Sequence, residues 1–67
     1  MKNIQYKIEY IKTHTTTDYQ FINNFNGSLR KAAEQLGFDV KTELLDRLGI
    51  KIFYTSDGSK KLTIWFN

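Results

Sequence analysis

No cysteine occurs in this chain of 67 residues, so disulfide bonds and thiolate metal sites are excluded. The single histidine, His14, cannot form a zinc site from imidazoles alone. A domain of this size buries only about 60% of the surface that its unfolded chain exposes. The sequence therefore predicts one small domain, residues 1–67, that depends on aliphatic and aromatic packing and uses no metal or other cofactor.

The N-terminal residues alternate apolar and charged side chains and contain no continuous apolar stretch. We therefore expect neither a signal peptide nor a membrane span, and a cytoplasmic location. The formal net charge of +3 is compatible with a DNA or RNA partner without requiring one. Many Lys, Ile and Asn residues and no proline are typical of a low-GC bacterium, or of its phages or plasmids.

Strand periodicity is clearest near the N-terminus. Ile4, Tyr6, Ile8 and Tyr10 alternate with polar residues, which predicts a strand over residues 3–12 with one buried face. The threonine-rich residues 13–17 predict a loop.

Residues 18–25 fit two interpretations. Tyr19, Ile22 and Phe25 recur at helical spacing, which favours a short helix. Tyr19, Phe21 and Phe25 also fit one face of a strand. We expect the helix.

Two further helices are predicted in the middle of the chain. Ser28 is a good N-cap for the first helix and Asp39 for the second, and Gly37 and Gly49 provide left-handed stops. The apolar stripes are Leu29, Ala32, Ala33 and Leu36 on the first helix, and Val40, Leu44, Leu45 and Leu48 on the second.

The C-terminal residues predict a hairpin with its turn at Asp57-Gly58. A bulged turn that places Thr55 opposite Ser59 gathers the apolar side chains of Ile50, Ile52, Tyr54, Leu62, Ile64 and Phe66 on one face, whereas a two-residue turn would split this set. We therefore expect the bulged register. The opposite face would then display Lys51, Phe53, Thr55, Lys61, Thr63 and Trp65, together with Lys7 if the first strand joins the sheet.

These elements predict an α+β fold. An N-terminal strand, two or three short helices and a C-terminal β-hairpin would form a small antiparallel sheet with the helices on its apolar face. No catalytic motif or phosphate-binding glycine loop is present, and the carboxylates are scattered, so we expect a binding protein rather than an enzyme.

The segment 28–50 and the hairpin after it resemble a winged helix-turn-helix. The residues that carry the resemblance are Ala32, Ala33, Leu36 and Gly37 of the first helix and turn, and Leu44, Leu45 and Leu48 of the next helix. The resemblance implies that the second helix enters the major groove and that the hairpin acts as a wing on the DNA backbone. The acidic side chains Asp39, Glu43 and Asp46 of this second helix instead favour a basic protein partner.

The lysine and aromatic face of the hairpin is a second candidate site. Its rings could stack on bases while its lysines meet phosphates, or it could bind a protein, or residues 18–25 could cover it. The candidate residues for nucleic acid or a partner are Lys7, Lys51, Phe53, Lys61, Thr63, Trp65, Arg30, Lys31, Lys41 and Arg47.

Two functions follow from these patterns. The first is a small nucleic-acid-binding regulator of winged-helix type. The alternative is a phage- or plasmid-encoded inhibitor, of anti-CRISPR or antirestriction type, that binds a host nucleic-acid-binding protein. Either function is compatible with a homodimer.

Overall fold

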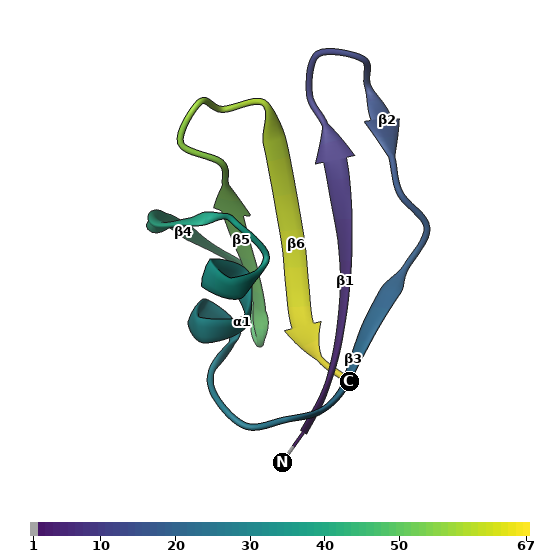
Figure 1. The fold of residues 1–67 in the computed structure, drawn as a ribbon, viewed down its shortest axis with the longest axis vertical. Coiled ribbons are helices and arrows are strands. Elements are labelled where there is room, and N and C mark those ends of the chain that lie inside the picture. Colours follow the sequence, from purple (N-terminus) through teal and green to yellow (C-terminus); the bar gives the residue numbers. More distant parts are fainter. Residues whose placement is uncertain (1) are drawn as a thin grey trace.

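The computed structural model describes residues 2–67 and contains one six-stranded antiparallel sheet in this range (Figure 1). Its strands lie in the order β2-β1-β6-β5-β4, and β3 also pairs with β1. No helix in residues 2–67 has the length and apolar character needed to cross a membrane. The elements are β1 (Lys2–Tyr10), β2 (Thr15–Thr16), β3 (Gln20–Phe25), α1 (Leu29–Gln35), β4 (Asp39–Arg47), β5 (Ile50–Tyr54) and β6 (Lys60–Phe66).

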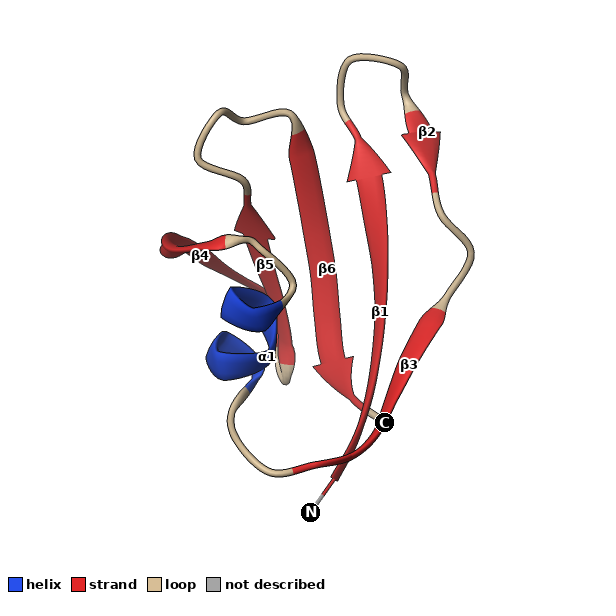
Figure 2. Cartoon of the chain, viewed as in Figure 1, coloured by secondary structure: helices blue, strands red, loops and turns tan. Residues whose placement is uncertain are grey.

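Strands replace two of the predicted helices, so the expectation of two or three helices and a hairpin is wrong (Figure 2). Residues 20–25 form β3 at the edge of β1, the alternative that we did not favour. Residues 39–47 form β4 and pair with β5. Within this segment the Thr42 hydroxyl accepts a hydrogen bond of 2.7 Å from the backbone N–H of Tyr54. Pairing with β5, whose edge would otherwise be open, therefore outweighs the helical spacing of Leu44, Leu45 and Leu48.

The predicted first helix and both of its boundary signals are confirmed. Ser28 caps α1, and its hydroxyl accepts a hydrogen bond of 3.2 Å from the backbone N–H of Lys31. Gly37 has a φ of 92° and follows the last turn. The backbone N–H of Phe38 donates to the carbonyl of Ala33 at 3.0 Å, and the Phe38 side chain is buried against the core. This is the stop that a left-handed glycine permits.

The core lies between α1 and one face of the sheet. On the sheet side Ile4, Phe53, Leu62 and Ile64 are fully buried. They meet Leu29, Ala32, Ala33 and Phe38, which come from α1 and the segment after it. Because Ala32 and Ala33 have only methyl side chains, α1 packs close to the sheet and the Phe53 ring fits beneath it.

The hairpin register differs from the predicted one. Phe53 pairs with Leu62 and Ile52 pairs with Thr63. The backbone N–H of Thr55 donates to the carbonyl of Lys60 at 3.1 Å, so residues 56–59 form the loop. Phe53 therefore points toward α1 and Ile52 points away from it. The hydrophobic pattern could not decide the register, because β5 carries apolar side chains on both faces.

Asp57 stabilises this loop. Its Oδ1 accepts hydrogen bonds from the backbone N–H of Ser59 at 2.9 Å, from the Ser59 hydroxyl at 2.7 Å and from the Thr55 hydroxyl at 2.8 Å. The bonds from Ser59, followed by the bond from Thr55, lower the pKa of Asp57 from its ordinary 3.8 to about 2.

Truncation of Phe53 tests the register. Phe53→Ala should lower the free energy of unfolding by about 3–5 kcal/mol, because it leaves a cavity under α1. The matched variant Phe21→Ala, at a ring that is 56% exposed, should change this free energy by no more than about 0.5 kcal/mol. Urea unfolding followed by circular dichroism measures both. Equal losses would show that Phe53 does not lie in the core.

Acid titration tests the role of Asp57. A lowered folded-state pKa stabilises the fold fully above the unfolded pKa, and this stabilisation is lost as the pH falls from about 4 toward 2. Asp57→Asn should lack this contribution, so the stability difference between wild type and variant should shrink over that range. Urea unfolding at a series of pH values measures it. A difference that is constant from pH 5 to about pH 2 would contradict the assignment.

Candidate binding face of the sheet

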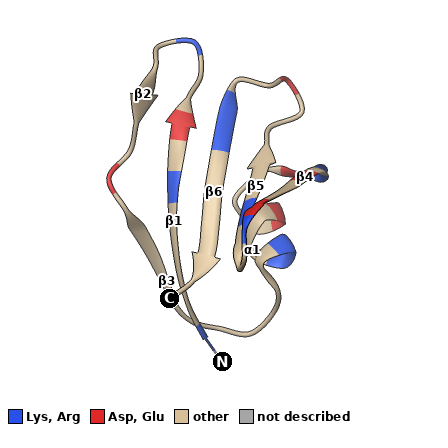
Figure 3. Ribbon diagram, turned by 180° about the vertical axis from the view of Figure 1, so that it is seen from behind, with Lys and Arg blue, Asp and Glu red and all other residues tan. Residues whose placement is uncertain are grey.

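The side of the sheet away from α1 carries no covering element within residues 2–67, and we call it the open face (Figure 3). Directly paired residues on neighbouring strands point to the same side, so the register identifies its members. They are Gln5, Lys7 and Glu9 on β1; Thr16 on β2; Lys61, Thr63 and Trp65 on β6; Ile50, Ile52 and Tyr54 on β5; Asp39, Leu44 and Arg47 on β4; and Phe21 on β3.

One cross-strand row on this face contains two large rings. Phe21 pairs with Gln5, Gln5 pairs with Trp65, and Trp65 pairs with Ile50. Because neighbouring strands lie about 4.8 Å apart, the backbones of Phe21 and Trp65 are about 10 Å apart, with Gln5 between them. The row therefore presents ring, amide, ring and aliphatic side chain in that order.

Tyr19 adds a third ring to this row. Its ring lies edge-on to Trp65, with the centroids 5.8 Å apart and an interplanar angle of 83°. The Lys7 ammonium lies 5.8 Å from the Tyr19 centroid. Tyr19 and Phe21 are 55% and 56% exposed, so their ring surfaces remain available to a ligand. Tyr19, Phe21 and Trp65 form what we call the aromatic cluster.

Two further rows continue the open face. One contains Lys7, Thr63, Ile52 and Leu44, and the other contains Glu9, Lys61 and Tyr54. The β1 and β6 part of the face is thus polar and basic, whereas the β5 and β4 part is aliphatic. The charged members are Lys7, Lys61 and Arg47 against Glu9 and Asp39, which gives a small positive excess.

The structure brings together four of the predicted site residues on β1 and β6 and separates two others from them. Lys7, Lys61, Thr63 and Trp65 share the open face. Phe53 lies in the core instead, because the observed register turns it toward α1. Lys51 pairs with the buried Ile64 and so lies on the side of α1.

Lys51 takes part in an ion-pair network on the side of α1. Its Nζ lies 2.8 Å from Glu43 Oε2, and Arg30 Nε lies 3.1 Å from Glu43 Oε1. The hydrogen bond from Lys51, with a further one from Arg30, lowers the pKa of Glu43 although burial opposes the shift. The network ties α1 to β4 and β5, and it uses three residues that were predicted to meet a partner.

Of the other predicted residues, Asp39 and Arg47 lie at the β4 margin of the open face, because they pair with Tyr54 and Ile50. Lys31 is an exposed residue of α1. Lys41, Asp46 and Arg47 are exposed on β4. Asp39 Oδ1 accepts a hydrogen bond of 3.0 Å from the backbone N–H of Lys41. The three acids therefore do not form the acidic helix face that was expected, because their segment is an edge strand.

Sequence reasoning missed Gln5, Tyr19 and Phe21 as site residues. The signal was the strand interpretation of residues 18–25, which placed Tyr19, Phe21 and Phe25 together. The structure keeps the first two near the open face but packs Phe25 against the core. Asn24, with a φ of 56°, lies where the pairing of β3 with β1 shifts register, and this irregularity separates Phe25 from the others.

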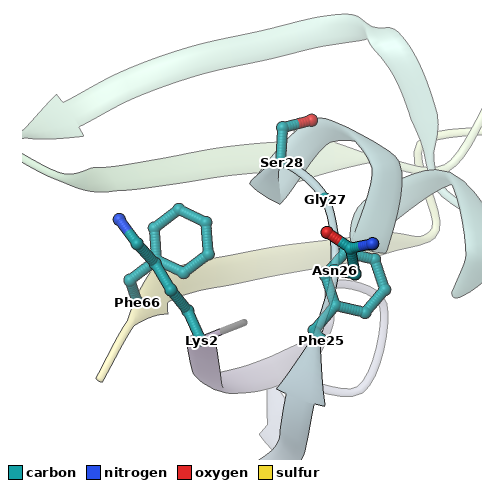
Figure 4. Close-up of a pocket in the computed structure, with 6 residues that line it drawn as sticks. All are labelled: Lys2, Phe25, Asn26, Gly27, Ser28 and Phe66. Carbon is teal, nitrogen blue, oxygen red and sulfur yellow. The ribbon is translucent and has the colours of Figure 1, made fainter.

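A hollow of about 420 Å³ lies on the other side of the molecule, near the start of α1 (Figure 4). It is lined by Lys2, Phe25, Asn26, Gly27, Ser28 and Phe66. The single charged group among them, the Lys2 ammonium, lies 4.8 Å from the centroid of the Phe66 ring. Gly27 is explained by packing, since a Cβ there would lie 2.9 Å from the Phe25 ring. The open face, with more exposed rings and polar groups, is the stronger candidate.

The fluorescence of Trp65 tests the geometry of the aromatic cluster, because the chain has a single tryptophan. Tyr19→Ala should shift the emission of Trp65 to longer wavelength and increase its quenching by acrylamide, since it uncovers one edge of the indole. Tyr10→Ala, a control at a residue that pairs with Lys60 at the far end of β1, should leave the emission unchanged. Identical spectra for wild type and Tyr19→Ala would contradict the contact.

Comparison with protein-family models, with curated proteins and with solved structures gave no match for this chain. A proposal of function therefore rests on the geometry of the open face.

Proposed function

We propose that the protein is a binding module for single-stranded DNA or RNA and that the open face is its binding surface. In this proposal the aromatic cluster stacks on bases, while Lys7 and Lys61 contact phosphates. The observation that carries the proposal is the row Phe21, Gln5, Trp65 on adjacent paired strands, beside Tyr19 and Lys7. The proposal is compatible with the cytoplasmic location that the sequence predicts.

A single strand suits this surface better than a duplex. Stacking on a protein ring requires a base whose π face is uncovered, which a duplex does not offer. Residues 39–47, which were expected to form a helix that enters the major groove, form the edge strand β4 instead. The proposal therefore retains the nucleic-acid partner expected from the sequence but assigns it to the sheet rather than to a winged helix-turn-helix.

The polar groups around the rings support a base rather than an apolar side chain as ligand. Gln5 offers an amide donor and acceptor between Phe21 and Trp65, and Thr63 offers a hydroxyl next to Lys7. Base edges can satisfy these groups while the rings stack. An apolar protein surface would remove them from water without a partner, which costs free energy.

A second candidate function is the protein inhibitor that binds a host nucleic-acid-binding protein. The observation that favours it is the aliphatic part of the open face, where Leu44, 54% exposed, pairs with the buried Ile52 beside Ile50 and Tyr54. An aromatic and aliphatic centre with a polar rim is the usual composition of a protein interface. Contact through the acids is less favoured, because Glu43 is already paired with Lys51 and Arg30.

Titration with single-stranded oligonucleotides, followed by the fluorescence of Trp65, tests the first proposal. The double variant Lys7→Gln/Lys61→Gln should bind more weakly and should flatten the log–log salt dependence by about 1.4, since each phosphate contact contributes about 0.7 for single strands. The charge-matched control Lys2→Gln/Lys31→Gln, at exposed residues on the side of α1, should keep the wild-type slope.

Trp65→Ala, measured by fluorescence anisotropy of a labelled oligonucleotide, should lose about 1–3 kcal/mol of binding free energy without a change in slope. If the wild type fails to bind DNA or RNA at micromolar concentration in low salt, the nucleic-acid proposal is wrong and the inhibitor remains. If the control double variant flattens the salt dependence as much as Lys7→Gln/Lys61→Gln does, the phosphates do not contact Lys7 and Lys61.

A further inference from the structure

The connection between β3 and α1 contains the adjacent pair Asn26 and Gly27. Because β3 ends at Phe25 and α1 begins at Leu29, residues 26–28 belong to neither element. Asn26 and Gly27 are both exposed, and both line the hollow near the start of α1 (Figure 4). Water therefore reaches this pair, and no strand or helix fixes its backbone.

The two groups of this pair that can react with one another are both free of hydrogen bonds. The backbone N–H of Gly27 donates to no acceptor within residues 2–67. The side-chain amide of Asn26 likewise has no hydrogen bond in this range, whereas the neighbouring Ser28 hydroxyl accepts one from Lys31. The Asn26 side chain can therefore turn its amide carbon toward the Gly27 nitrogen without breaking an interaction.

Packing requires that the residue after Asn26 is a glycine. The φ of Gly27 is 153°, a value that other residues rarely adopt. A Cβ on Gly27 would lie 2.9 Å from the ring of Phe25, which packs against the core. The fold thus keeps position 27 without a side chain, and no Cβ hinders the approach of its nitrogen to the Asn26 amide.

We propose that Asn26 is a site of spontaneous covalent modification, at which its amide becomes a carboxylate through a cyclic imide. The Gly27 nitrogen forms a bond to Cγ of Asn26, and the bond from Cγ to the side-chain nitrogen breaks. That nitrogen leaves as ammonia and carries away the proton of the Gly27 N–H. The attack is intramolecular, which favours it over direct attack by water on the amide. The inference does not depend on the proposed function.

Water, the only other reactant, then opens the imide in one of two ways. Addition of water at Cγ restores the normal backbone and gives aspartate at position 26. Addition at the backbone carbonyl carbon of residue 26 gives isoaspartate, in which the main chain runs through the former side chain. Neither route involves an oxidant or a reductant, and the two products together identify the imide.

Three other asparagines provide a contrast within the same chain. Asn3 lies in β1, and Asn23 and Asn24 lie in β3. Each is followed by a residue that has a side chain. Asn3 is held further, because its Oδ1 accepts a hydrogen bond of 3.0 Å from the backbone N–H of Asn24. Asn26 should therefore lose its amide before these three.

The conversion changes both the charge and the backbone of the connection. The new carboxylate lowers the formal net charge of +3 by one. It joins a hollow in which the Lys2 ammonium is the single charged group. Isoaspartate also lengthens the main chain by one carbon atom just before Ser28, which caps α1, and the buried Leu29. The isoaspartate form should therefore hold α1 less firmly than the aspartate form.

Peptide mass spectrometry of purified protein, incubated at slightly alkaline pH, tests the proposal. Asn26 should lose its amide at least about tenfold faster than Asn23 and Asn24, which corresponds to about 1.4 kcal/mol in activation free energy. Both aspartate and isoaspartate should form. The rate at Asn26 in the folded protein should lie within about tenfold of its rate in urea, because the fold leaves the pair free.

Three results would overturn the proposal. They are equal rates at Asn26, Asn23 and Asn24, aspartate as the only product, and a rate in the folded protein that is more than about tenfold below the rate in urea. Asn26→Gln is the matched control, since its longer side chain would have to form a larger ring. It should keep its charge on ion exchange over the period in which the wild type loses one unit, and an equal loss would place the reaction at another residue.

A comparison of two proteins tests the effect on α1. Converted wild type, separated from unconverted chains by ion exchange, contains aspartate and isoaspartate, whereas freshly prepared Asn26→Asp contains the same charge on a normal backbone. The converted protein should unfold at lower urea concentration than Asn26→Asp, as measured by circular dichroism. Identical unfolding curves would show that the longer main chain does not disturb the packing of α1.

Discussion

The contact between a short helix and one face of the sheet determines the rest of this structure. The seven residues of α1 are the only helix within residues 2–67, and Ala32 and Ala33 bring it close enough to bury Phe53, Leu62 and Ile64. A single small helix covers one face and leaves the other in contact with water. With neither disulfides nor a second covering layer in this range, the fold retains an open face that carries aromatic and aliphatic side chains.

Local signals in the sequence were sufficient for some of these features and insufficient for others. The cap at Ser28, the stop at Gly37 and the alternation in β1 were predictable because each depends on near neighbours along the chain. The strand β4 was not, because its leucines follow helical spacing while its pairing depends on β5. The hairpin register was missed because Ile52 and Phe53 are both apolar, and only the position of α1 determines which of them packs beneath the helix.

The candidate site was predictable to a similar extent. Lys7, Lys61, Thr63 and Trp65 were correctly grouped, because their alternation along β1 and β6 does not depend on the register of β5. Lys51 and Phe53 were misplaced by the same one-residue register error, which moves every side chain of a strand to the other face. The contribution of Tyr19 and Phe21 depended on a long-range pairing of β3 with β1, which the sequence of residues 18–25 did not specify.

The central claim is that the open face, and not the face covered by α1, binds single-stranded nucleic acid. Amide chemical-shift mapping by NMR during titration with a single-stranded oligonucleotide tests it most directly, because it locates the ligand without any substitution. The account predicts that the largest shifts occur at Gln5, Lys7, Thr63 and Trp65 and that α1 changes little. Shifts concentrated on α1, or none at low salt and high oligonucleotide concentration, would contradict it.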